Sequence, residues 1–186
     1  LHNGSSVGEN STFCKMIKSE RLHLRKIIPS DLDILLSWEN DKINHLFSDS
    51  PTYYTKEHMQ AFVDSNQDLF VNNQLRLMIE FGKNIVGCID LFEFDPFHLR
   101  AGVGILIDRQ FRKKGFAKES ILLLEKYAFN SMGINQLHCK ISSSNRGSVL
   151  LFESCGFLKS GHLKSWIKRK DLFEDVLIYQ KLNSKQ

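Results

Sequence analysis

Residues 108–117 read DRQFRKKGFA, and this stretch decides the fold. It joins an apolar segment over 101–107, which predicts a strand, to a segment over 116–130 with helical spacing. Gly115 at the helix entrance lets the backbone approach a ligand, and the first helical amides form the positive end of the helix dipole. The stretch therefore predicts an anion site with phosphate as its ligand, although a solvated basic corner is the alternative interpretation. Its spacing is neither that of a P-loop nor that of a Rossmann dinucleotide site.

The hydrophobic pattern around this stretch alternates between strands and helices. Residues 21–25 have strand spacing, and residues 75–81 and 85–94 flank the turn-rich 82–84 as a hairpin. The remaining expected elements are a helix beginning at Ser30 or Asp31, a helix over 55–70, a strand at 137–141, a short helix at 145–154, and strands at 157–167 and 172–182. This order predicts a single α/β (α+β) domain, with a mixed sheet and helices on both faces.

A second informative stretch covers residues 145–157 and reads NRGSVLLFESCGF. It resembles the N-x-x-S/A-x-x-x-Y/F-x-x-x-G-F segment of the GNAT superfamily of acetyl-CoA-dependent N-acetyltransferases. Residues 112–117 resemble that family's R/Q-x-x-G-x-G/A motif. Each motif is weak alone, but both occur in the family's order, with a strand and a helix between them. The resemblance covers about residues 18–182 and is greatest to bacterial spermidine acetyltransferases and ribosomal-protein N-terminal acetyltransferases.

This resemblance implies a mostly antiparallel sheet that is splayed in the middle, between the strand ending at Ile107 and the strand beginning at Leu137. The slot would hold acetyl-CoA, with strand backbone pairing with the pantetheine arm, loop amides on the pyrophosphate, and Asn145 and Ser148 near the arm or its thiol end. The cofactor-binding residues implied are Ile105, Leu106, Ile107, Arg112, Lys113, Lys114, Gly115, Phe116, Ala117, Lys118, Asn145 and Ser148.

The chemistry implied is direct attack of an amine on the thioester in a ternary complex, which needs a base for the amine and an acid for the thiolate. Relatives often place a glutamate base where this chain has Gly102, and a tyrosine acid where it has Phe152. Asp90, Glu93 or Glu80 could act as a base through water, although substrate-charge or surface roles are the alternatives. Ser148 matches the serine of ribosomal-protein acetyltransferases as an acid, and its alternative role is hydrogen bonding at the start of the helix.

The acceptor is expected to be a primary amine, with a polyamine favoured. Residues 1–108 carry a net charge of −5 and residues 109–186 one of +9, so the first part suits a cation and the second the anionic cofactor. Trp38, Glu39 and Asp41 lie where relatives border their acceptor site, and an aromatic with carboxylates can hold an ammonium group. A solvated helix end explains these residues equally well. A peptide N-terminus is the alternative acceptor.

Two other function classes stay open at this point. A nucleic-acid-binding module is suggested only by the basic run at 166–170, which lacks a recognition signature. A catalytically weak CoA-binding protein is suggested by Gly102 and Phe152.

Composition sets the remaining expectations for this chain of 186 residues. No apolar run approaches the length of a membrane span, and residues 1–15 read as a flexible leader or added tail rather than a signal, leaving 16–186 as the catalytic domain. The cysteines are scattered without zinc spacing, so no metal site is expected. We therefore expect a soluble, cytoplasmic protein with neither a membrane nor a nucleic-acid partner. The resemblance adds that a homo-oligomer is possible.

Overall fold

The structure is a computed structural model that describes residues 17–45, 52–65 and 67–184. The leader expected over residues 1–15 lies outside these ranges. In chain order the strands are β1 (Leu22–Lys26), β2 (Leu75–Phe81), β3 (Asn84–Asp95), β4 (Arg100–Ile107), β5 (Gln136–Ser142), β6 (Leu158–Arg169) and β7 (Leu172–Leu182). The helices are α2 (Leu32–Glu39), α3 (Lys42–His45), α4 (Lys56–Asp64), α5 (Leu69–Asn72), α6 (Phe116–Asn130) and α7 (Arg146–Ser154), with 3₁₀ turns at Pro29–Asp31 and Arg109–Phe111.

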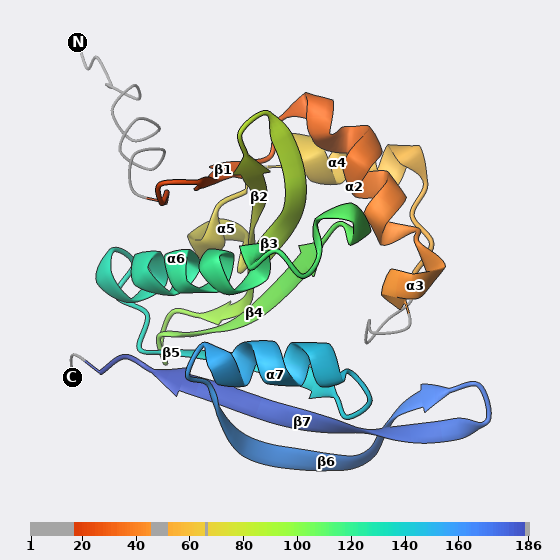
Figure 1. Ribbon diagram of the computed structural model, residues 1–186, viewed down its shortest axis with the longest axis vertical. Coiled ribbons are helices and arrows are strands. Elements are labelled where there is room, and N and C mark those ends of the chain that lie inside the picture. Colours follow the sequence, from red (N-terminus) through yellow and green to blue (C-terminus); the bar gives the residue numbers. More distant parts are fainter. Residues whose placement is uncertain (1–16, 46–51, 66, 185–186) are drawn as a thin grey trace.

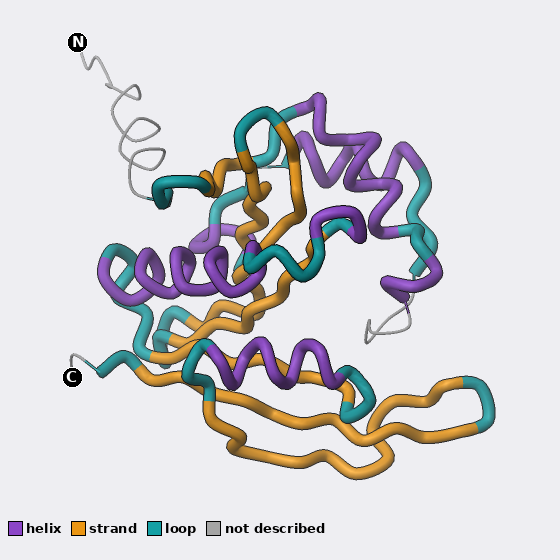
Figure 2. Tube along the Cα trace, viewed as in Figure 1, coloured by secondary structure: helices purple, strands orange, loops and turns teal. Residues whose placement is uncertain are grey.

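The described strands form one mixed sheet in the order β1-β2-β3-β4-β5-β7-β6 (Figure 1). Every neighbouring pair is antiparallel except β4 and β5, which run parallel. The predicted α/β class, with a mostly antiparallel sheet, is therefore confirmed. The long β6–β7 hairpin extends beyond α7 at one end of the molecule (Figure 2).

Helices cover both faces of the sheet and create two apolar cores. On one face, α5, α6 and α7 pack on the sheet, and α6 contributes the predicted stripe of Ile121, Leu124 and Ala128. On the other face, α2 and α4 cover a smaller core that contains Met78 and Cys88 of β2 and β3. Alternate residues of the central strands thus face different helices, which decides the side of the sheet that each polar residue reaches.

The single helix expected over residues 55–70 is wrong. Two helices, α4 and α5, occupy this stretch, and Ser65 between them has extended backbone angles. Its hydroxyl bonds back to the Phe62 carbonyl at 2.6 Å, and Asp68 caps α5 by accepting from the Phe70 amide at 2.8 Å. Short polar side chains of this kind compete with helical backbone bonding and end helices.

The start of α2 also differs in detail from the expectation. Asp31 precedes the helix as predicted, but its carboxylate does not cap the helical amides. It instead accepts two hydrogen bonds from Arg25, at 2.6 and 2.8 Å, and one from the Ile28 amide at 2.9 Å. Burying a carboxylate is costly unless it is paired with a positive charge, so Asp31 bonds Arg25 and not the helix amides. This pair links the start of α2 to β1.

None of the described helices is long and apolar enough to cross a lipid bilayer.

Candidate active site

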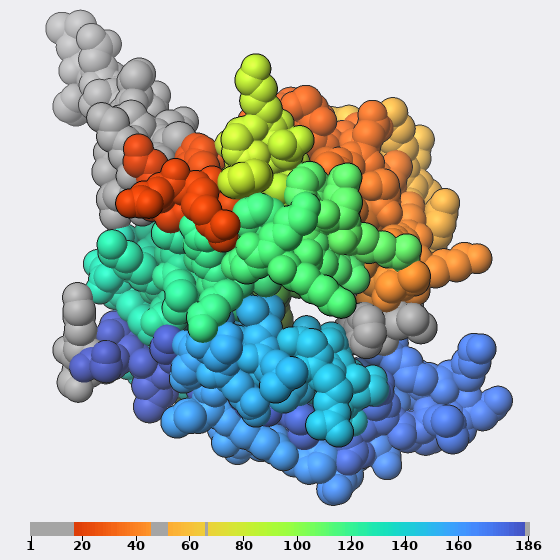
Figure 3. Space-filling view, in the orientation of Figure 1, coloured from red at the N-terminus to blue at the C-terminus, as the bar shows by residue number. Residues whose placement is uncertain are grey.

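The centre of the sheet is split where β4 and β5 diverge. The two strands pair only from Arg100 to Gly102 on β4 and from Gln136 to His138 on β5. Beyond Gly102, β4 pairs only with β3, so its edge toward β5 keeps free backbone donors and acceptors. A cavity of about 640 Å³ lies at this gap, and the space-filling view shows the hollow between the green and the blue parts of the chain (Figure 3). The predicted splay is therefore present.

One end of this cavity is formed by the loop that enters α6. Gly115 is the residue before the helix and has φ of +81°, a conformation that favours glycine. No described residue accepts a hydrogen bond from the backbone amides of residues 113–118, which leaves a run of free donors at the positive end of the helix dipole. Arg112, Lys113 and Lys118 line the same end. This combination fits an anionic phosphate group.

Two contacts hold this loop in place. Arg112 donates from Nε to the carbonyl oxygen of Ile107 at 2.9 Å, and from Nη2 to Asn44 Oδ1 at 3.2 Å. Glu119, in the first turn of α6, is engaged by Arg21 at 2.7 Å and by the Ser19 hydroxyl at 2.5 Å. Burial opposes its ionisation, but these two donors hold the pKa of Glu119 below its usual range. The one acid in the first turn of α6 is thus neutralised.

Helix α7 forms the opposite wall. Asn145 caps it by accepting from the Ser148 amide at 3.1 Å, and both residues line the cavity. The alternative role of Ser148 as a capping hydroxyl is filled by Asn145, and no described residue hydrogen-bonds the Ser148 hydroxyl. Phe152 also lines the cavity and stacks edge-on against Phe157, with ring centroids 5.1 Å apart. This wall is apolar apart from Asn145 and Ser148.

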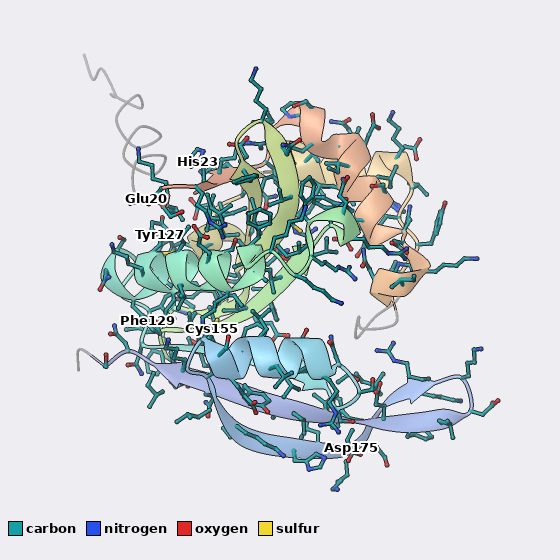
Figure 4. All side chains as sticks on the ribbon, in the orientation of Figure 1. Glu20, His23, Tyr127, Phe129, Cys155 and Asp175 are labelled. Carbon is teal, nitrogen blue, oxygen red and sulfur yellow. The ribbon has the colours of Figure 1, made fainter. Side chains whose placement is uncertain are left out.

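Cys155, at the C-terminal end of α7, lies between α7 and α6 (Figure 4). It is buried, and burial raises the pKa of its thiol. It is therefore packed as a small apolar residue.

All three carboxylates expected to relay protons, Asp90, Glu93 and Glu80, are ion-paired. Asp90 accepts from Arg76 Nε at 2.6 Å and from Nη2 at 3.1 Å, and Arg76 also bonds Glu39 at 2.5 Å. Burial raises the pKa of Asp90, while Arg76 opposes that rise. Glu93 is more exposed, and its carboxylate lies 3.7 Å from Lys140 Nζ. Glu80, on β2, bonds Arg25 and His23 and does not line the cavity.

The three residues expected at the acceptor site have different surroundings. Trp38 is buried and donates from Nε1 to Asp108 at 2.9 Å, while Asp41 lies 3.4 Å from Arg109. Both line a second cavity of about 420 Å³, which shares Asn44 and Arg112 with the first. Glu39 does not line it and instead bonds Arg76. The structure thus brings Trp38 and Asp41 together and separates Glu39 from them.

Most of the predicted cofactor residues gather around the larger cavity. Among the residues implied by the resemblance, those that line it are Ile105, Leu106, Ile107, Arg112, Lys113, Gly115, Phe116, Ala117, Lys118, Asn145 and Ser148. Lys114 does not line it, and its ammonium group lies 5.3 Å from the ring centre of Phe111. Asn44 and Lys140 also line the cavity and were missed. The alternation of the predicted strand over 137–141 could have indicated Lys140, whereas nothing in the sequence places Asn44 there.

No cluster of three or more acidic, histidine or cysteine side chains suited to a metal occurs in the described ranges.

Comparison with known proteins gives a consistent set of similarities. The acetyltransferase (GNAT) domain family matches residues 21–158. A spermidine N(1)-acetyltransferase of Vibrio cholerae is 26% identical over 172 residues, which cover 90% of this chain and 96% of that protein. A prophage-derived uncharacterized N-acetyltransferase of Bacillus subtilis is 28% identical over 162 residues, covering 86% of this chain and 89% of that protein.

Solved structures resemble the fold closely. The crystal structure of the Vibrio cholerae spermidine N-acetyltransferase in complex with CoA and spermine superposes with a TM-score of 0.82, at 24% identity, over 90% of this chain and 98% of that one. A dodecameric structure of the spermidine N-acetyltransferase from the same organism gives a TM-score of 0.77 at 26% identity, over 90% and 96% of the two chains.

Proposed function

The chain belongs to the GNAT family of N-acetyltransferases, and we propose that it transfers the acetyl group of acetyl-CoA to a primary amine by direct attack in a ternary complex. The slot between β4 and β5 is the observation that carries this proposal. It combines a free strand edge, a basic loop with unbonded amides, and an apolar wall. These features suit an amide-bearing arm that ends in a pyrophosphate.

Residues on both walls of the slot would contact acetyl-CoA, each wall binding a different part of the cofactor. The edge of β4 over Ile105–Ile107 would pair with the amides of the arm, and residues 112–118 would hold the phosphates. When bound, the cofactor supplies an activated acetyl thioester. Ser148 would donate its hydroxyl proton toward the leaving sulfur, because its side chain is free of described protein partners and lines the slot.

Rate enhancement on this arrangement depends mainly on positioning. Holding an amine and a thioester together in a reactive geometry can contribute about 7 to 11 kcal/mol. Catalysis therefore does not require the glutamate that relatives carry at the position of Gly102. This reasoning favours an active enzyme over a CoA-binding protein with weak catalysis.

A polyamine is the first acceptor that we propose, because spermidine N-acetyltransferases of Vibrio cholerae and Escherichia coli are among the chain's relatives. A peptide N-terminus is the second. It is favoured by one observation: no aspartate or glutamate occurs among the described residues that line the slot, whereas Lys140 does. A polyamine would rely on Asp41 and the second cavity, and a peptide would place its own carbonyl groups near Lys140.

The test is the release of free thiol from acetyl-CoA with a panel of amines: spermidine, spermine, single amino acids and short peptides with free N-termini. We expect turnover with at least one class and acetylation of its amine in the mass spectrum. A protein that binds CoA in calorimetry but acetylates no amine would refute the enzymatic proposal. Tight, salt-sensitive binding of random oligonucleotides without any effect of acetyl-CoA would favour the nucleic-acid alternative.

A further inference from the structure

His138 lies at the vertex of the slot. It pairs with Gly102 at the last position where β4 and β5 are joined, and the next residues, Val103 and Cys139, line the cavity. Its neighbours Leu137 and Cys139 are buried in the core beneath α6 and α7. Because side chains alternate along a strand, the His138 ring is on the opposite face of the sheet.

That face of β4 carries no side chain beside the vertex. A Cβ on Gly102 or Gly104 would project from this face, and the Phe92 ring covers the position at Gly102. A Cβ built on Gly104 would meet its nearest atoms, in Phe92 and Asp90, only at 3.5 Å and beyond. The His138 and Phe92 rings lie edge to face, with centroids 6.5 Å apart. The His138 ring therefore lies beside bare β4 backbone and the Phe92 ring, at the point where β4 and β5 separate and the slot begins.

The His138 ring is free to take a proton. No described residue hydrogen-bonds either of its nitrogens, and the side chain is half-buried. The charged groups that face it are Glu93 on β3, Arg100 on β4 and Lys140 on β5, while β7 places the neutral Gln180 opposite it. Burial lowers the pKa of His138 below its usual value, with Lys140 and Arg100 acting in the same direction and Glu93 against it. The imidazole is thus neutral near pH 7.

The carboxylates on this face are less suited to accept a proton. Both oxygens of Asp90 are occupied by Arg76, and Glu93 lies beside Lys140. A proton that reaches either carboxylate has to displace the cation paired with it, Arg76 for Asp90 and Lys140 for Glu93. His138 has no such direct partner.

We propose that His138 is the general base that deprotonates the acceptor amine, an assignment that rests on the proposed acetyl transfer. The ring nitrogen takes one proton from the incoming ammonium group, and the neutral amine then attacks the acetyl carbonyl carbon. A carbon–nitrogen bond forms and the carbon–sulfur bond breaks. The second proton leaves the nitrogen as the sulfur is protonated, through Ser148 or solvent, and the imidazolium returns its proton to water.

The test compares His138→Gln with the wild type across pH, using kcat/KM for the amine at saturating acetyl-CoA. We expect the wild type to be faster by about 10²- to 10⁴-fold near pH 8, the range for a positioned general base. The ratio of the two enzymes should fall toward one as pH drops through the His138 pKa, below 6.5, because the wild type then loses its base. Titration of the amine acts on both enzymes and cancels in this ratio. Added imidazole should partly restore His138→Ala.

His162→Gln is the matched control, because His162 lies on β6, which β7 separates from β5, and bonds Asp175. It should keep the wild-type rate and pH profile. A ratio of one for His138→Gln at all pH values, or a loss that does not change with pH and is not restored by imidazole, would overturn the assignment.

The failure of the proposed function would be seen separately, as a wild type that acetylates no amine in the panel. In that case the imidazole signals of His138, followed by NMR as CoA is added, decide its placement. A shift of these signals on CoA binding is expected, and signals unaffected by saturating CoA would refute a position at the vertex.

Discussion

At the scale of single residues, Phe92 explains why β4 carries glycine where relatives often carry a glutamate. A Cβ on Gly102 would lie 2.6 Å from the Phe92 ring, which is closer than real atoms pack. A longer side chain there requires the ring to move away, so the glycine and the phenylalanine form one packing unit. Gly102 pairs with Phe92 on β3 and with His138 on β5, and of these two neighbours only His138 has a side chain that can accept a proton, which supports the proposed base.

Ser148 allows a sharp test at the same scale. We predict that Ser148→Ala lowers kcat about 10-fold or more and leaves the affinity for acetyl-CoA within about twofold, since donation to a leaving group acts only during reaction. Turnover kinetics and calorimetry check the two parts.

Ser154→Ala is the control for this substitution, on the same helix. The Ser154 hydroxyl donates to the Leu151 carbonyl at 2.8 Å, is exposed, and does not line the slot. It should leave both kinetic constants unchanged. An unaltered kcat in Ser148→Ala would remove the serine as the acid, and an equal loss in both variants would indicate a general effect on α7.

At the scale of elements, Arg76 joins three pieces of the fold. From β2 it bonds Asp90 on β3 and Glu39 at the end of α2, and its guanidinium lies 5.2 Å from the centre of the Phe62 ring of α4. Its side chain is 14% exposed. Removing one member of such a buried cluster leaves an uncompensated charge, which is more damaging than the loss of a surface pair.

We therefore predict that Arg76→Met lowers the free energy of unfolding by about 3 to 5 kcal/mol, measured by urea denaturation. Arg109→Met is the comparison, because the Arg109–Asp41 pair is wider, at 3.4 Å, and its arginine is 53% exposed. That change should lower stability by no more than about 1 kcal/mol. Adding Asp90→Asn to Arg76→Met should recover part of the loss. Equal effects of the two arginine variants would show that burial of the cluster contributes little.

Helices and strands with a regular apolar spacing and a glycine or turn at their ends were predictable from the sequence. The helix over 116–130 and the strand at 75–81 were predicted with the bounds that the structure has, because apolar spacing, Gly115 and the turn at 82–84 all agree. The helix over 55–70 was not predictable as two helices, since its break depends on side-chain bonds of Ser65 and Asp68. The four-residue α3 has no buried residue, so no apolar pattern could reveal it.

The parts of the site that are formed by backbone groups and by residues close together in the sequence were predictable. Gly115 and the basic residues before α6 indicate the loop that we propose binds the phosphates, and the gap between β4 and β5 follows from the resemblance. The state of the acidic residues was not predictable, because Arg76 comes from a strand distant in sequence from Glu39 and Asp90. His138 was overlooked because a single histidine on a strand has no local signature.

At the scale of the whole molecule, the sheet has two parts joined by a short seam. One part holds β1–β4 and the other holds β5–β7, and they meet where β4 pairs with β5 and where α6 packs near α7. The slot continues this seam, with walls from both parts. A ligand that contacts both walls bridges the two parts of the sheet. Because it binds only the folded state, its stabilising effect grows with the logarithm of its concentration.

We predict that CoA at 100 times its dissociation constant stabilises the protein by about 2.7 kcal/mol, which raises the melting temperature by roughly 5 to 10 °C for a chain of this size. The increase should shrink with salt at fixed CoA concentration, because the basic residues Arg112, Lys113 and Lys118 line the slot and salt screens their attraction for an anion.

Gly115→Leu should abolish the increase in melting temperature caused by CoA, since a side chain at φ of +81° strains the loop that presents the amides. Gly82→Leu is the control, at φ of +60° in the β2–β3 turn with no atom within 4 Å of its Cβ, and it should lower the starting temperature but keep the increase. An equal response in both glycine variants would mean that CoA is held somewhere other than the start of α6.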